Sequence, residues 1–142
     1  MRWWAWKHGG QDGLAPDDVR MYVLYQKQNN LGPMERSVGI KNGSYGVVNA
    51  AATRQAAAKN NLIITHELLH ILGASDKYDQ ANLPIYPGGY ADPYQEPLYP
   101  QHLAEVMGGR IPVNKGIARI PQKLAQVVVG PSTASEIGWY TQ

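Results

Sequence analysis

Two histidines and a glutamate are spaced in residues 65–79 as a metal-dependent hydrolytic site requires. Residues four apart lie on one face of an α-helix, so His66 and His70 can offer two imidazoles to one cation. Glu67 lies about 100° further round the helix than His66. From there it can reach a water on the cation without being a ligand itself. The spacing therefore predicts a metal site with a general base beside it.

A third ligand is expected shortly after the helix ends. Gly73 supplies the left-handed residue that terminates a helix, so the chain can turn back and bring Asp76 to the same cation. Three ligands leave a fourth position open, as in catalytic zinc sites. Asp79, His102 and Glu105 compete for the role, but Asp76 is favoured because it needs the shortest return of the chain.

The helix that positions these residues is expected to be long. Residues 50–58 are rich in alanine, and Thr53 is a plausible N-cap, so we expect a helix from there to Leu72. Its apolar residues should form the side opposite the ligands: Ile64, Leu68, Ile71 and Leu72.

Strands are expected before this helix. Residues 19–26 are β-branched and aromatic and predict a buried strand. Residues 38–40 and 45–48 flank Asn42-Gly43, a strong hairpin signal. Which of these strands forms a sheet edge stays open.

The second half of the chain looks more irregular. Residues 79–101 interleave prolines with tyrosines, which indicates an ordered loop with a functional role. The tyrosines of this region should mostly pack, and one of them is expected to line a substrate pocket: Tyr78, Tyr86, Tyr90, Tyr94 or Tyr99. Residues 124–129 predict a strand or a buried extended segment. Ser132 should cap a final helix over residues 133–139.

Length and composition limit the classes of protein to which this chain can belong. With 142 residues, the chain should form one domain with a real core. A formal net charge of +2 without dense basic runs does not indicate a nucleic-acid partner. No apolar run approaches the ~20 residues that span a bilayer, and we expect no signal peptide within this chain. The absence of cysteine excludes thiolate ligands and thiol nucleophiles.

The extended motif His66-Glu67-x-x-His70-x-x-Gly73-x-x-Asp76 resembles the zinc motif of the metzincin metalloproteases. Most metzincins have histidine as the third ligand. An aspartate there resembles the snapalysins, which are small secreted bacterial endopeptidases. The resemblance implies Zn²⁺ as cofactor, a peptide or protein substrate, and a secreted or periplasmic protein; we also expect a monomer.

Met107, in Glu105-Val106-Met107-Gly108, resembles the metzincin Met-turn. The resemblance implies an α+β zincin domain with an upper part, residues 1–73, that contains a small twisted sheet and the active-site helix. Residues 74–142 would form an irregular lower part with the Met-turn and a short C-terminal helix. Several metzincins have a tyrosine two residues after the methionine. Here that residue is Gly109, so such a role falls elsewhere or is absent.

These residues predict a zinc-dependent endopeptidase in which Glu67 takes a proton from the metal-activated water. An anionic Asp76 would make that water less acidic than a third histidine would, so Glu67 becomes more necessary. Two alternatives remain: a zinc-dependent hydrolase of small or non-protein amides, and a catalytically silent peptide-binding module. The presence of Glu67 argues against the silent module.

Overall fold

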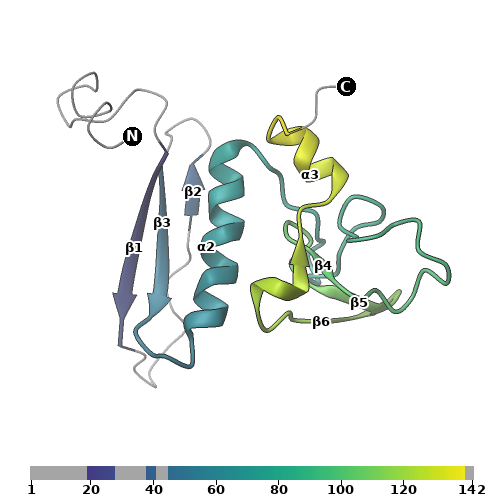
Figure 1. Ribbon diagram of the computed structural model, residues 1–142, viewed down its shortest axis with the longest axis horizontal. Coiled ribbons are helices and arrows are strands. Elements are labelled where there is room, and N and C mark those ends of the chain that lie inside the picture. Colours follow the sequence, from purple (N-terminus) through teal and green to yellow (C-terminus); the bar gives the residue numbers. More distant parts are fainter. Residues whose placement is uncertain (1–18, 28–37, 41–44, 140–142) are drawn as a thin grey trace.

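The computed structural model describes residues 19–27, 38–40 and 45–139 of the chain. Within them the fold is α+β, with small sheets and two helices (Figure 1). The elements, in chain order, are β1 (Arg20–Gln26), β2 (Val38–Ile40), β3 (Tyr45–Ala51), α2 (Ala57–Leu72), β4 (Ala104–Glu105), β5 (Ile111–Asn114), β6 (Ile117–Arg119), the 3₁₀ turn η2 (Leu124–Gln126), β7 (Val127–Val128) and α3 (Pro131–Glu136). None of the helices described in these ranges is long and apolar enough to cross a membrane.

The first sheet has three strands in the order β1-β3-β2. β3 runs parallel to β1, with Tyr45 opposite Arg20, and antiparallel to β2, with Val47 opposite Val38. The predicted pairing of residues 38–40 with the strand that begins at Tyr45 is therefore confirmed. The turn residues Asn42-Gly43 lie outside the described residues. Val48 of β3 is fully buried, as befits the central strand.

β1 forms where a strand was predicted, but it is not the buried strand we expected. Tyr22, Leu24 and Tyr25 are each about half exposed, at 52%, 48% and 65%. β1 is an outer strand of the sheet, with β3 on one side. β-branched and aromatic residues favour strand geometry, but that preference does not distinguish an edge strand from a central one.

α2 begins at Ala57, four residues later than the predicted start at Thr53. β3 continues through Ala51, and residues 52–56 form the connecting turn. The Thr53 hydroxyl accepts the Ala56 N–H (3.2 Å), so it caps that turn and not the helix. Sheet pairing has overridden the helix preference of the alanines.

The buried side of α2 also differs from the prediction. Leu69 and Ile71 are buried, whereas Leu68 and Leu72 are 36% and 41% exposed. α2 packs on β2 and β3 and lies between that sheet and the second half of the chain, so it has two partly covered faces (Figure 1). Its end is as predicted, because Gly73 adopts a left-handed conformation with φ 111°.

The second half contains two short sheets. β4 pairs parallel with β7, and β5 pairs antiparallel with β6. The segment over residues 124–129, predicted as a strand or a buried extended segment, divides into η2 and β7. α3 begins at Pro131 with Gly130 as its N-cap residue, two residues before the predicted start, so Ser132 does not cap it. Proline suits the first turn of a helix because it lacks an N–H that would have no partner there.

The loop of residues 79–101 is held by its own backbone and side chains. Isolated bridges join Tyr78 to Pro84 and Tyr90 to Ala104. The buried Gln101 side chain donates to the Asp92 and Leu98 carbonyls, at 2.8 and 2.9 Å, and accepts the Asp92 N–H at 2.9 Å. These contacts fix the path of the loop between the candidate metal ligands and β4.

Candidate metal centre

His66, His70 and Asp76 meet at the end of α2. The Nε2 atoms of the two histidines lie 3.1 Å apart, and Asp76 Oδ1 lies 3.1 Å from the His66 Nε2 and 3.2 Å from the His70 Nε2. The three side chains could hold one metal ion between them. These are the three residues that the sequence predicts as ligands.

Local structure explains how they meet. The histidines are four apart on α2, so their rings lie on one side of the helix, with their centroids 4.7 Å apart. After Leu72 the left-handed Gly73 reverses the chain, and the Ala74 N–H returns to the Leu69 carbonyl at 2.9 Å. The reversal brings Asp76 back beside both rings.

Backbone carbonyls set the orientation of both imidazoles. His66 Nδ1 lies 3.0 Å from the Val106 carbonyl oxygen, and His70 Nδ1 lies 2.9 Å from that of Ala74. Because a carbonyl oxygen only accepts, each Nδ1 must carry the proton. With its Nδ1 donating to a carbonyl, a ring without a second proton presents its Nε2 lone pair to the Asp76 carboxylate and to the other ring. Three acceptors at this distance repel one another unless a cation, or an added proton, lies among them.

The geometry fits zinc. With bonds of about 2.0–2.1 Å, the ligand atoms of a tetrahedral zinc lie about 3.3–3.4 Å apart. The observed separations of 3.1, 3.1 and 3.2 Å are close to these values. Two imidazole nitrogens and one carboxylate oxygen are also a ligand set that zinc accepts in catalytic sites. Metal-binding histidines usually donate their other ring N–H to an outer partner, and the Val106 and Ala74 carbonyls are such partners here.

The competing residues are engaged elsewhere. Asp79 Oδ1 accepts the N–H groups of Ala81 and Leu83, each at 2.9 Å, and so caps a turn of the loop. His102 lines a separate cavity with Asp92 and Gln101. None of these residues joins the histidine cluster within the described part of the chain.

Glu105, the remaining competitor, is fully buried. Its Oε2 accepts the N–H groups of Met107 (2.7 Å) and Gly108 (2.8 Å). Its Oε1 accepts the Thr133 hydroxyl (2.6 Å) and the Gly130 N–H (3.2 Å). The carboxylate therefore joins the turn around Met107 to the start of α3.

Met107 is fully buried. It belongs to one apolar cluster with Val106, with Leu69, the residue before His70, and with Ala74, whose carbonyl accepts from the His70 ring. The carbonyl of Val106 also accepts from His66. Met107 thus packs with residues whose backbone carbonyls hold both histidine rings.

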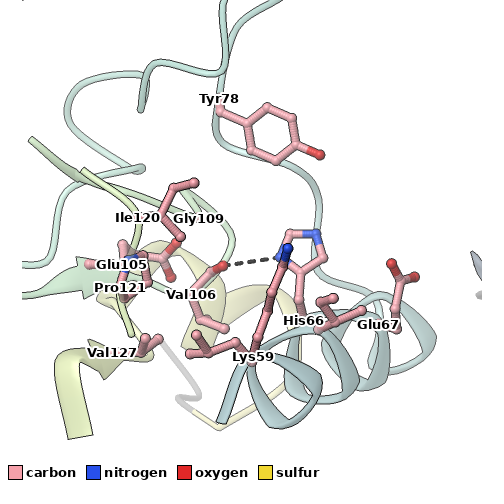
Figure 2. A pocket seen from close by; sticks show the side chains of 13 residues that line it. Lys59, His66, Glu67, Tyr78, Glu105, Val106, Gly109, Ile120, Pro121 and Val127 are labelled. Carbon is pink, nitrogen blue, oxygen red and sulfur yellow. Dashed lines mark hydrogen bonds between the residues drawn. The ribbon is translucent and has the colours of Figure 1, made fainter. Parts of the chain in front are cut away.

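A cavity of about 280 Å³ opens beside His66 and Glu67 (Figure 2). Apolar side chains make up most of its wall, from α2 on one side and from residues 104–127 on the other: Leu62, Ile63, Ala104, Val106, Ile120, Pro121 and Val127. Lys59 and Tyr78 also line it. The general base expected from the sequence therefore borders the same cavity as a candidate ligand.

Tyr78 is a pocket residue that sequence reasoning did not single out from the other loop tyrosines. Its ring centroid lies 6.3 Å from that of His66, and it reaches over His66 from the segment that follows Asp76 (Figure 2). Residues two apart in an extended segment point to the same side. The spacing of Asp76 and Tyr78 is the signal that could have identified it.

No protein-family model, curated protein or solved structure matches this chain. The likeness to metzincins thus rests on the motif around Glu67 and on the turn around Met107. What the chain does must be inferred from the arrangement of its own residues.

Proposed function

We propose that this protein is a zinc-dependent endopeptidase with His66, His70 and Asp76 as metal ligands and Glu67 as general base. The observation that carries the proposal is the convergence of three lone-pair donors within 3.2 Å of one another at the side of an apolar cavity. Backbone carbonyls that accept from each Nδ1 orient both histidine rings toward this point.

Zinc bound here would supply Lewis acidity, which polarises a water and a substrate carbonyl. Glu67 would act as the general base, taking a proton from the attacking water and passing it to the leaving amine. On this proposal Tyr78, which lines the cavity with its ring centroid 6.3 Å from that of His66, would donate a hydrogen bond to the negative charge that develops on the substrate oxygen. It takes the role that Gly109 cannot perform.

Peptide substrates suit the cavity. Its apolar wall offers a site for a side chain next to the cleaved bond, and the Asp76 side chain is 44% exposed, so the centre is accessible from solvent. On this proposal the chain is a metzincin-like zincin domain, active as a secreted monomer. The sheet with α2 would form its upper part, and the segment with Met107 its lower part.

Zinc analysis combined with a peptide-library digest tests the function. The purified protein should contain one zinc per chain. It should cleave substrate peptides at internal bonds, and the products mapped by mass spectrometry should show a preference for certain residues next to the cleaved bond. Glu67→Ala should keep the zinc and lose cleavage. Hydrolysis of small amides without peptide cleavage would favour the amidase alternative. Zinc and peptide binding with no turnover on either substrate would favour the silent module.

A further inference from the structure

The segment that carries Asp76 is held from both sides by one residue of α3. Glu136 Oε2 accepts the Ser75 N–H at 2.9 Å, and Glu136 Oε1 accepts the Ser75 hydroxyl at 2.7 Å. The Lys77 ammonium donates to Glu136 Oε2 at 2.7 Å. The residues immediately before and after Asp76 are therefore bound to the same carboxylate.

Lys77 is a buried cation, only 8% exposed. Its ammonium also donates to the Ser75 carbonyl at 3.0 Å, and its backbone N–H donates to the Met107 carbonyl at 2.9 Å. A buried charge needs a partner of opposite sign. Glu136 supplies that partner, so the position of Lys77 depends on Glu136.

The alternation of side chains explains why these contacts matter for Asp76. In an extended segment, successive side chains point to opposite sides. Ser75 and Lys77 turn toward α3, and Asp76 turns toward the histidines. Since the Asp76 side chain is 44% exposed, packing constrains it little, and its direction is set mainly by the backbone on either side.

α3 is itself fixed at its other end. The Thr133 hydroxyl and the Gly130 N–H both donate to the buried Glu105 carboxylate, which also holds the turn around Met107. α3 therefore connects the turn that supports His66 with the segment that supplies Asp76.

We propose that Glu136 is a positioning residue that sets the direction of Asp76 through Ser75 and Lys77, without contacting the metal. The inference rests on the proposed function, because it takes Asp76 as a ligand. The outer partners of metal ligands typically change metal affinity about 10–100-fold when they are replaced.

The protonation of Glu136 agrees with this geometry. Burial raises the pKa of its carboxyl group, but hydrogen bonds from Lys77 and Ser75 outweigh burial and lower the pKa below its usual value. The carboxylate is thus stabilised in the charged form that the Lys77 ammonium requires.

Glu136→Gln in the full chain tests the proposal, because glutamine keeps the shape of the side chain but cannot neutralise Lys77. We expect zinc binding, measured by competition with a chelator, to weaken about 10–100-fold. The absorption spectrum of the cobalt-saturated protein should change, and the Ser75 amide should exchange its hydrogen faster. Glu96→Gln removes the same charge from an exposed loop position and should change none of these.

The outcomes separate this proposal from the proposed function. The positioning role is overturned if Glu136→Gln binds zinc as tightly as the parent. It is also overturned if zinc affinity falls while the cobalt spectrum is unchanged and the unfolding temperature is lower, because the loss is then one of stability alone. If Glu136→Gln does not fold, Ser75→Ala removes a single hydroxyl hydrogen bond and should shift affinity and spectrum in the same direction by a smaller amount; no shift there also overturns it. A parent chain that binds no zinc refutes the proposed function, and the ligand role of Asp76 with it.

Discussion

Glu105→Gln tests whether the Glu105 carboxylate has a structural role or is a metal ligand. The hydrogen bonds of the carboxylate set the size of the expected loss in stability. The buried carboxylate accepts hydrogen bonds from Met107, Gly108, Gly130 and Thr133. A glutamine can keep its oxygen on the Met107 and Gly108 N–H groups and turn its amide toward Thr133, whose hydroxyl can rotate to accept. The Gly130 N–H is then left without an acceptor.

One buried donor without a partner costs about 1–3 kcal/mol. We therefore expect Glu105→Gln to lower the free energy of unfolding by roughly that amount. Glu105→Ala leaves the Met107, Gly130 and Thr133 donors unpaired, whereas the Gly108 N–H keeps the backbone carbonyl of residue 105. At about 1–3 kcal/mol for each unpaired donor, the loss should be about 3 kcal/mol or more, a large share of the ~5–15 kcal/mol that stabilises a typical domain. Glutamine is therefore the more useful variant, because the protein should remain folded.

Urea unfolding followed by circular dichroism measures this loss, and a zinc assay on the same sample measures metal content. The midpoint should fall without a change in the slope m, while one zinc per folded chain is retained. Thr133→Val removes one donor and serves as a matched variant with a smaller loss. Stability within about 0.5 kcal/mol of the parent, or loss of zinc from a fully stable Glu105→Gln, would refute the structural role assigned to Glu105.

Three further predictions concern the base, the turn and pH. Glu67→Ala should retain zinc but lose about 10²–10⁴-fold or more in turnover; peptide cleavage at the parent rate would disprove the mechanism. Met107→Leu should cost less than about 1.5 kcal/mol in urea unfolding and leave zinc and most activity intact; loss of zinc from a folded variant would indicate a ligand role. Because the folded-state pKa of Glu136 is lowered, its contribution to stability should be complete above its ordinary pKa of 4.5 and should be lost as pH falls below that value. Urea midpoints of Glu136→Gln should approach those of the parent in acid, and a constant difference at every pH would contradict this.

Local signals predicted which three side chains come together at the end of α2. The i, i+4 spacing of His66 and His70 and the left-handed Gly73 act within a few residues, so these local signals suffice to predict that the chain returns Asp76 toward the rings. The pairing of β2 with β3 was likewise evident from a short pattern around one turn.

Contacts between distant parts of the chain could not be predicted in this way. Ala51 lies in an alanine-rich stretch that favours helix, but it pairs with Gln26 in the sheet. Glu105 resembled a competing ligand because its donors Gly130 and Thr133 lie 25 and 28 residues further along. Glu136 showed no signal, since its role depends on Ser75 and Lys77, about 60 residues earlier.

Zinc affinity of the parent and of Asp76→Ala is the most direct test of the proposed centre. Asp79→Ala is the matched control, because it removes the same side chain three residues later, where the carboxylate caps a loop turn. By competition with a chelator, the parent and Asp79→Ala should each bind one zinc per chain with similar affinity. Asp76→Ala should bind far more weakly, because only the two imidazoles remain. Zinc held as tightly by Asp76→Ala as by the parent would contradict the assignment of this centre.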